Sequence, residues 1–133
     1  MKAPRSRDSI GCDVVSIPRL ARVLGRNPPA FRDELFTQVE HRAGHAGVEE
    51  LALCFAVKEA TLKALGTGFI AGIKATDIEV RLDERNTAEV TLYGAPAALV
   101  RARGATLQAE TALCGDHATA VVHLLSPHPR GGA

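Results

Sequence analysis

The sequence has few of the features that mark nucleic-acid-binding, membrane or secreted proteins. Aromatic residues make up 4% of the 133, with no tryptophan, which argues against the base-stacking surfaces of single-strand-binding proteins. The formal net charge is +1, so the global balance does not require nucleic acid or an anionic membrane as partner. No run approaches the ~18 apolar residues of a membrane span, and MKAPRSRDS at the start lacks the apolar segment of a signal peptide. We therefore expect a cytoplasmic protein that binds neither nucleic acid nor membrane.

Cysteine is also scarce, and its placement argues against a structural role. The three cysteines, Cys12, Cys54 and Cys114, are widely separated, and none belongs to a CxxC or a Cys/His pair with zinc spacing. A structural zinc site is thereby disfavoured. We expect free, buried thiols in a reducing compartment.

What is present fits one globular domain with a core of its own, since hydrophobic residues make up 46% of the chain. The β-branched run at 10–17 predicts a strand, and Pro18 suits the first turn of a helix over 18–26. Thr37, with Glu40 three residues later, predicts a helix N-terminus. Residues 48–65 predict a long helix that ends at Gly66.

The second half of the chain alternates apolar and polar residues. The runs at 78–82 and 88–94 predict an antiparallel hairpin. Residues 95–107 are weakly helical or form a crossing segment, and 111–125 end in a strand. The order predicts an α+β fold, in which an antiparallel sheet packs against a long buried helix. We assign residues 10–125 to one domain, and residues 1–9 and 126–133 to flexible ends.

The helix over 48–65 is apolar on nearly every side, yet it carries Lys58, Glu59 and Lys63 within an arc of roughly 140°. Ala52 and Ala56 lie in the same arc, where they are expected to leave room for a ligand. An ordinary reading is an i,i+4 ion pair between Glu59 and Lys63, which contributes only a few tenths of a kcal/mol.

The combination with two other features favours chemistry instead. Asp13 on the first strand and Glu59 make a plausible two-carboxylate site for a hard cation such as magnesium. Lys58, Lys63 and the backbone N–H groups of the turn at 66–68 are complementary to phosphate. Together they suggest phosphate chemistry on a metal-bound diphosphate.

Two stretches also carry a family resemblance. IGCDVVSIPRL, followed by FAVKEATLKALGTG, resembles the signatures of the holo-acyl-carrier-protein synthases, the small single-domain 4′-phosphopantetheinyl transferases. LFT with Glu40 after it, TDIEV and VTLYGAPAA match as well, so that the resemblance covers about residues 10–125.

The resemblance implies a transferase that moves the 4′-phosphopantetheine arm of coenzyme A onto a serine of an acyl or peptidyl carrier protein. Such an enzyme requires magnesium and releases adenosine 3′,5′-bisphosphate. The resemblance also implies a homotrimer with sites between subunits, but it does not choose among fatty-acid, polyketide and peptide synthesis. One alternative is a catalytically weakened module of the same fold that binds coenzyme A or a carrier protein. Another is a structural protein whose charges form a buried network.

The resemblance further assigns roles to residues. Asp13 and Glu59 would hold magnesium on the diphosphate of coenzyme A, and Lys63 would stabilise the transition state or protonate the leaving group. Lys58 would contact the phosphates as well. Glu59, or a water held by it or by Asp13, is the candidate base. The turn formed by Gly66, Thr67 and Gly68 would lie against the nucleotide.

On the first helix, Arg19, Arg22 and Arg26 recur at three- and four-residue spacing and therefore share a face. They match the basic helix with which the family docks the acidic helix of the carrier protein. A solvated arginine face is the ordinary alternative.

The sequence departs from the family pattern at two places. Cys54 stands where the family commonly has arginine, which removes a cation near the nucleotide. ETALCGDHATAVV replaces the Ser-x-Ser-His stretch, and a gapless reading puts Leu113 at the position of the histidine. Asp116 and His117 lie close by, so that His117 is the candidate contact for the adenine and 3′-phosphate end if the loop is rearranged.

Overall fold

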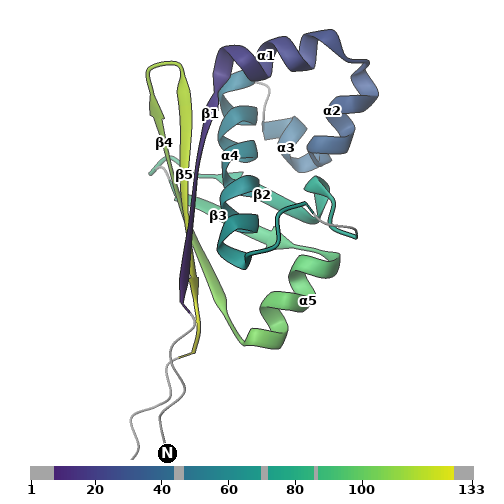
Figure 1. The fold of residues 1–133 in the computed structure, drawn as a ribbon. Coiled ribbons are helices and arrows are strands. Elements are labelled where there is room, and N and C mark those ends of the chain that lie inside the picture. The colour runs from purple at the N-terminus through teal and green to yellow at the C-terminus, as the bar shows by residue number, and fades with distance from the viewer. Residues whose placement is uncertain (1–7, 44–46, 70–71, 86, 128–133) are drawn as a thin grey trace, which may run out of the picture.

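The fold is a single antiparallel sheet with its helices gathered on one face. The computed structural model describes residues 8–43, 47–69, 72–85 and 87–127. The sheet has five strands in the order β1-β5-β4-β3-β2: β1 Ser9–Ser16, β2 Ile78–Leu82, β3 Thr87–Leu92, β4 Thr106–Cys114 and β5 His117–Leu125. The helices are α1 Ile17–Arg26, α2 Pro29–Leu35, α3 Gln38–Ala43, α4 Val48–Leu65, α5 Gly94–Arg103 and the short 3-10 helix η2 Ala75–Asp77 (Figure 1). The predicted α+β class is confirmed.

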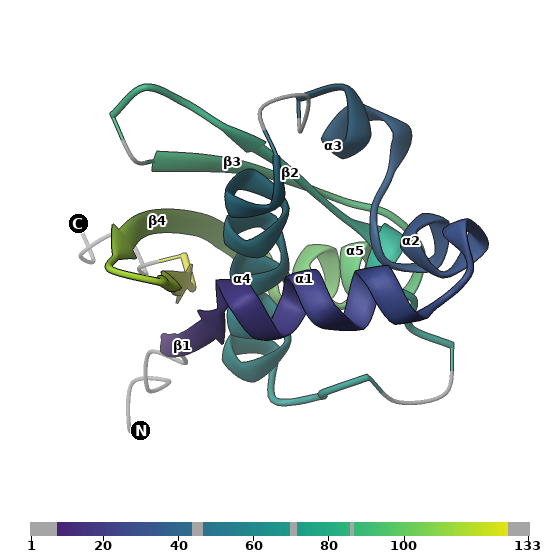
Figure 2. The same cartoon turned by 90° about the horizontal axis from the view of Figure 1, so that it is seen from above.

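Helix α4 has the predicted bounds and forms the centre of the core. It lies across one face of the sheet, on which α1, α2 and α3 also gather (Figure 2). Ala52, Val57 and Leu62 point to different sides of the helix, and each has 0% of its surface exposed. The helix ends at Gly66, whose φ of 78° is left-handed and favours glycine.

Strand β1 approaches α4 so closely that one position must be glycine. A Cβ atom built on Gly11 would lie 1.8 Å from the carbonyl oxygen of Ala60. Side chains alternate along a strand, so Asp13 shares the α4 side of β1 with Gly11. Ile10 and Val14 point to the other face and are 60% and 63% exposed. The Gly-x-Asp motif thus places a carboxylate directly beside the buried helix.

The C-terminal third contains more structure than its pattern predicts. The hairpin of β2 and β3 is confirmed, and so is a strand at the end of 111–125, which is β5. The strand before it, β4, was not predicted; it forms a second hairpin with β5, with Gly115 in the turn at a φ of 59°. The undecided segment at 95–107 contains α5 and the start of β4. β4 escaped prediction because TLQAETALC is poor in β-branched and aromatic residues; its strand state comes from pairing with β5 and β3.

Other predictions have mixed outcomes. The capping pair is confirmed, since the Thr37 amide donates to Glu40 Oε1 at 2.8 Å and the Glu40 amide donates to Thr37 Oγ1 at 3.3 Å. The expected burial of the thiols is right for Cys54 and wrong for Cys12 and Cys114, which are exposed.

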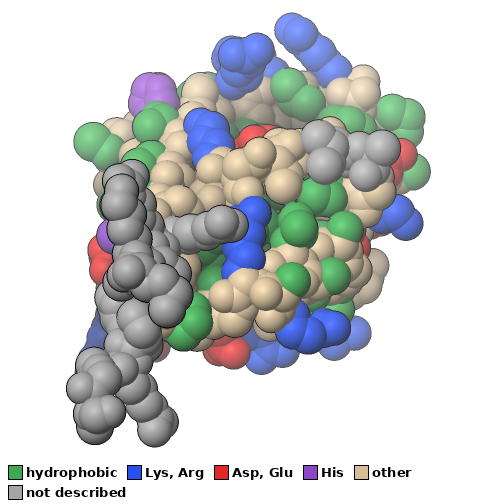
Figure 3. Space-filling view, turned by 60° about the horizontal axis from the view of Figure 1, so that its bottom comes forward, with side chains coloured by type: hydrophobic (Ala, Val, Ile, Leu, Met, Phe, Trp, Pro, Cys, Tyr) green, Lys and Arg blue, Asp and Glu red, His purple; other side chains and the backbone are tan. Residues whose placement is uncertain are grey.

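The ends of the chain are described only in part. Of the segments predicted to be flexible, residues 1–7 and 128–133 lie outside the described residues, while Ser9 already pairs with Leu124 in the sheet. In the described part of the chain, no helix has the length and hydrophobicity needed to cross a membrane. On the face shown in Figure 3, lysine and arginine side chains stand in separate groups among apolar and acidic ones.

Candidate active site

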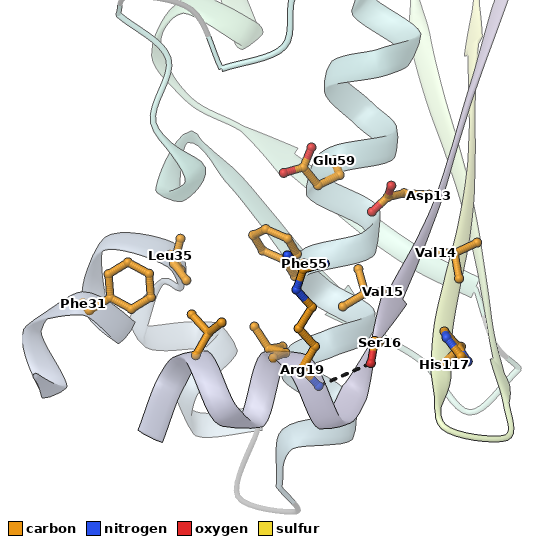
Figure 4. Close-up of a pocket in the computed structure, with 12 residues that line it drawn as sticks. Asp13, Val14, Val15, Ser16, Arg19, Phe31, Leu35, Phe55, Glu59 and His117 are labelled. Atoms are coloured by element: carbon orange, nitrogen blue, oxygen red, sulfur yellow. Dashed lines mark hydrogen bonds between the residues drawn. The ribbon is translucent and has the colours of Figure 1, made fainter. Parts of the chain in front are cut away.

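A cleft of about 560 Å³ opens where α1, α2, β1 and α4 meet (Figure 4). Asp13 and Glu59 lie at one end of it, on β1 and α4, and both carboxylates extend toward the open space. An apolar wall continues from them along α4 to α1 and α2. The lining residues that matter below are Asp13, Arg19, Phe31, Leu35, Phe55 and Glu59.

Asp13 and Lys63 form an ion pair at the edge of this site. Lys63 Nζ lies 2.9 Å from Asp13 Oδ1 and donates a second hydrogen bond, of 3.0 Å, to the Cys12 carbonyl. The Asp13 side chain is 17% exposed and that of Lys63 is 55% exposed. The hydrogen bond and the charge of Asp13 raise the pKa of Lys63, so this ammonium stays protonated at neutral pH. Lys63 is therefore a cation beside Asp13 that lies outside the lining of the cleft.

Glu59 is a carboxylate in an unfavourable setting. Desolvation by burial and the negative charge of Asp13 raise its pKa, and the positive charge of Lys63 acts against them. The ion pair that the described residues give Lys63 is with Asp13 on β1, so the simple i,i+4 pair with Glu59 is not what the structure contains. Two carboxylates with one ammonium leave the group with one uncompensated negative charge, which suits a cation.

The donor set fits magnesium better than a metal held entirely by protein. Within residues 8–43, 47–69, 72–85 and 87–127, no three His, Cys, Asp or Glu side chains gather as a metal site. Magnesium commonly takes one or two carboxylates and completes its octahedron with waters and substrate phosphates. Asp13 and Glu59 meet that requirement, because both are oxygen ligands facing one open cleft.

Lys58 does not belong to this site, and its predicted phosphate contact is wrong. Its side chain is 0% exposed and points away from the cleft, into the core. Nζ lies 2.9 Å from Glu40 Oε1 and donates to the carbonyls of Ala75, at 2.9 Å, and Ile78. These three acceptors use all three N–H groups of the ammonium. Burial lowers the pKa of Lys58, and the charge of Glu40 opposes that shift.

The turn at 66–68 is also not arranged as predicted. The Gly66 and Thr67 amides donate to the carbonyls of the last turn of α4, so they are not available to a phosphate. The turn lies at the C-terminal end of α4, where the helix dipole disfavours an anion. None of the three residues lines the cleft. Ala52 and Ala56, which were expected to leave room for a ligand, are 0% exposed and serve packing instead.

The remaining predicted residues are divided around the cleft. His117 lines its rim and pairs through Nδ1 with Asp116 Oδ1 at 2.8 Å, while Leu113 stands on β4 with 48% of its surface exposed. Of the three arginines on α1, all of which are exposed, Arg19 lines the cleft, and Arg22 lies outside its lining. Arg26 also lies outside it.

Sequence reasoning missed the apolar wall of the cleft. No pattern in the sequence indicated that Phe31, Leu35 and Phe55 form one wall. All three side chains are partly buried in the structure. Periodicity could not show this wall, because it gives the face of a helix but not the residues that lie opposite it. Ser16 is a further omission; its side chain caps α1 by accepting from the Arg19 amide at 3.3 Å.

The proteins to which this chain is similar in sequence belong to one family. The family model of the 4′-phosphopantetheinyl transferase superfamily matches residues 9–122. A holo-[acyl-carrier-protein] synthase of Nitratidesulfovibrio vulgaris is 40% identical over 120 residues, which cover 88% of this chain and 97% of that protein. A holo-[acyl-carrier-protein] synthase of Halorhodospira halophila is 36% identical over 119 residues, covering 87% and 94%.

Solved structures of holo-[acyl-carrier-protein] synthases are similar to this chain in fold. The ACPS–CoA complex of Chronobacterium ammoniagenes superimposes with a TM-score of 0.77 at 29% identity, covering 91% of this chain and 98% of that one. Helicobacter pylori holo-[acyl-carrier-protein] synthase in complex with coenzyme A gives a TM-score of 0.75 at 27% identity, with coverages of 86% and 98%.

Proposed function

Because the chain belongs to the holo-acyl-carrier-protein synthases of the 4′-phosphopantetheinyl transferase superfamily, we propose that it transfers the 4′-phosphopantetheine arm of coenzyme A to a serine of an acyl carrier protein. One observation carries the proposal to this chain's own residues. Asp13 and Glu59 come from β1 and α4 to one cleft, where they supply two oxygen ligands, and Lys63 stands beside Asp13 as a cation outside the lining of that cleft. Such a set is what transfer from a diphosphate requires.

In this proposal Asp13 and Glu59 hold Mg²⁺ together with the diphosphate of coenzyme A. The bound metal ion supplies neutralisation of the charge that develops between the attacked and leaving phosphates. The raised pKa of Glu59 supports the assignment, because it reports a carboxylate short of positive charge. Adenosine 3′,5′-bisphosphate is then the leaving product.

Lys63 acts on the open side of the same group. Its ammonium is held beside Asp13 yet remains more than half exposed, so it can also reach a phosphate oxygen. A protonated lysine at that position stabilises the negative charge of the transition state, and it can donate a proton to the leaving group. The raised pKa of Lys63 favours the charged form that stabilises the transition state.

The hydroxyl of the carrier serine must lose a proton as it attacks. In this proposal Glu59 accepts it, directly or through a water that Glu59 holds. A water held by Asp13 is the alternative route. The serine approaches from the side of α1, whose exposed Arg19, Arg22 and Arg26 complement an acidic carrier helix.

We further propose a homotrimer in which neighbouring subunits complete each site. The outer face of β1 carries Ile10 and Val14, both about 60% exposed, which is the kind of apolar surface that assembly covers. Gly66, Thr67 and Gly68 do not line the cleft of their own chain, and in the proposed trimer they would lie against the nucleotide in a neighbour's site. Sedimentation velocity on the purified protein tests the assembly.

The function is tested by mass spectrometry of apo carrier proteins incubated with the protein, coenzyme A and Mg²⁺. A mass increase of one phosphopantetheinyl group is expected, and it should be lost with a chelator and in Glu59→Gln. Lys74→Met serves as the control variant, because Lys74 is exposed and does not line the cleft. No transfer to any carrier protein of the host would refute the proposal.

A further inference from the structure

A closed polar network lies behind the site, on the side of α4 that faces away from the cleft. Lys58 and Glu40 form an ion pair of 2.9 Å with both side chains 0% exposed. Glu40 also accepts from the Val80 amide on β2, at 2.9 Å, through its second oxygen. Lys58 donates to the carbonyls of Ala75 and Ile78. The network therefore joins α3, η2 and β2 to α4.

The proposed chemistry does not use this pair, and its contribution to stability is not a sufficient reason for it. Desolvating two charges costs about as much as their attraction returns, so a buried ion pair is often no more stabilising than apolar residues of the same size. What such a pair can provide is a single arrangement of the elements it joins.

Helix α4 has a particular need for such a constraint. Its residues are apolar on nearly every side, with Leu51, Val57, Leu62 and Leu65 all buried. A helix that is buried all round has no polar face to fix its rotation about its own axis. Directional bonds at one residue supply what non-directional packing does not.

We propose that Glu40 and Lys58 are positioning residues for the active site, which fix the rotation and axial setting of α4 so that Glu59 faces Asp13 across the cleft. The inference rests on the proposed roles of Asp13 and Glu59. Lys58 precedes Glu59 directly, so the two side chains differ by about 100° of rotation and 1.5 Å of rise. Anchoring one therefore sets the direction of the other.

The opposite side of α4 is held by a second constraint of a different kind. The backbone at Ala60 lies against Gly11 of β1, two residues before Asp13. That contact sets how closely α4 approaches β1, and directional bonds also join the two elements: Lys63 Nζ donates to the Cys12 carbonyl and to Asp13, and Ser9 Oγ donates to the Ala64 carbonyl. Those bonds tie α4 to β1 alone, whereas the Lys58 network ties the opposite side of the helix to α3, η2 and β2.

The test compares Lys58→Met with Leu124→Ala. Leu124 is 0% exposed on β5, pairs with Ser9 and Leu107 at the far end of the sheet, and does not line the cleft. The double variant Glu40→Gln/Lys58→Met leaves no unpaired buried charge, so it can be used if the single variant does not fold. Each protein is assayed below its own thermal transition. Binding of Mn²⁺ in the presence of coenzyme A is measured by electron paramagnetic resonance, and KM and kcat are measured for coenzyme A.

The network variants should weaken Mn²⁺ binding by about 10- to 100-fold, as loss of a supporting interaction behind a metal ligand typically does. They should also lower kcat, with little change in KM. Leu124→Ala should lose stability without either effect. Unchanged Mn²⁺ affinity in the folded network variants, or an equal loss in Leu124→Ala, overturns the inference. Absence of transfer by the unmodified protein would instead refute the proposed function.

Discussion

Replacing Gly11 by alanine perturbs the site without substituting any of its functional side chains. The added Cβ would lie 1.8 Å from the Ala60 carbonyl oxygen and 2.7 Å from the Ala64 amide nitrogen, both of them backbone atoms that cannot rotate away. Side-chain carbons essentially never approach closer than 3.0 Å, so β1 and α4 must separate by about 1.2 Å locally. Overpacking of this kind typically costs about 1–3 kcal/mol.

The effect on activity should exceed the effect on folding. Asp13 is two residues from Gly11, and Glu59 precedes Ala60, so the separation moves the two carboxylates apart. A displacement of ~1 Å can cost about 100-fold in rate. We expect Gly11→Ala to lower the transition temperature by roughly 3–10 °C for a chain of this size. The rate of transfer should fall by about two orders of magnitude even where the protein is fully folded.

Gly25→Ala is the matched control. Gly25 lies in α1, and a Cβ built on it meets nothing within 4 Å. The same substitution there should stabilise the helix by about 0.5–1 kcal/mol, since glycine costs more conformational entropy than alanine. Thermal unfolding by circular dichroism and the mass-spectrometric transfer assay measure both variants. A Gly11→Ala protein with unchanged stability and transfer rate would refute the close approach of β1 to α4.

Four further predictions concern single side chains. Lys63→Met should change the transition temperature little, because the Lys63 side chain is more than half exposed, yet it should lower kcat by about 100- to 1,000-fold. A wild-type kcat in this variant would exclude the role of Lys63. Glu59→Gln should abolish Mg²⁺-dependent stabilisation by coenzyme A in thermal shift, whereas a retained shift would remove Glu59 from the metal site. Arg22→Glu should raise KM for the carrier protein, most strongly at low salt, and should leave KM for coenzyme A unchanged. If neither KM changed, α1 would have no docking role. Burial raises the pKa of the Cys54 thiol from 9.0 to about 12. Above about pH 9 the unfolded state therefore loses a proton that the folded state keeps, so the free energy of unfolding should fall as the pH rises. Cys54→Ala should show a shallower fall in urea titrations between pH 8.5 and 10, and equal slopes would contradict that assignment.

The structure also changes what the two departures from the family pattern mean. Cys54 is buried in the core with its thiol protonated, so it occupies a packing position in this chain rather than the cleft. Leu113 stands exposed on β4, whereas His117 reaches the rim of the cleft from the start of β5. The turn between β4 and β5 therefore places a histidine near the site.

The sequence by itself determined the elements whose signals are local. Three elements follow from periodicity and backbone chemistry within a few residues: the strand that contains Gly-x-Asp, the helix from Val48 to Leu65 with its glycine stop, and the Thr37 cap. The resemblance in IGCDVVSIPRL and FAVKEATLKALGTG likewise identified the family without coordinates. These signals suffice because each depends on neighbours that lie close along the chain.

Only the tertiary structure decided which charge on α4 serves which purpose. Lys58, Glu59 and Lys63 share an arc on a helical wheel, but Lys58 finds three acceptors from Glu40, η2 and β2, whereas Lys63 finds Asp13 on β1. Those partners are between 17 and 50 residues away along the chain, so no periodicity could assign them. β4 was missed for the same reason, since its strand state depends on pairing rather than on its own residues. A helical wheel gives the direction of a side chain, but only the tertiary structure shows which residues lie opposite it.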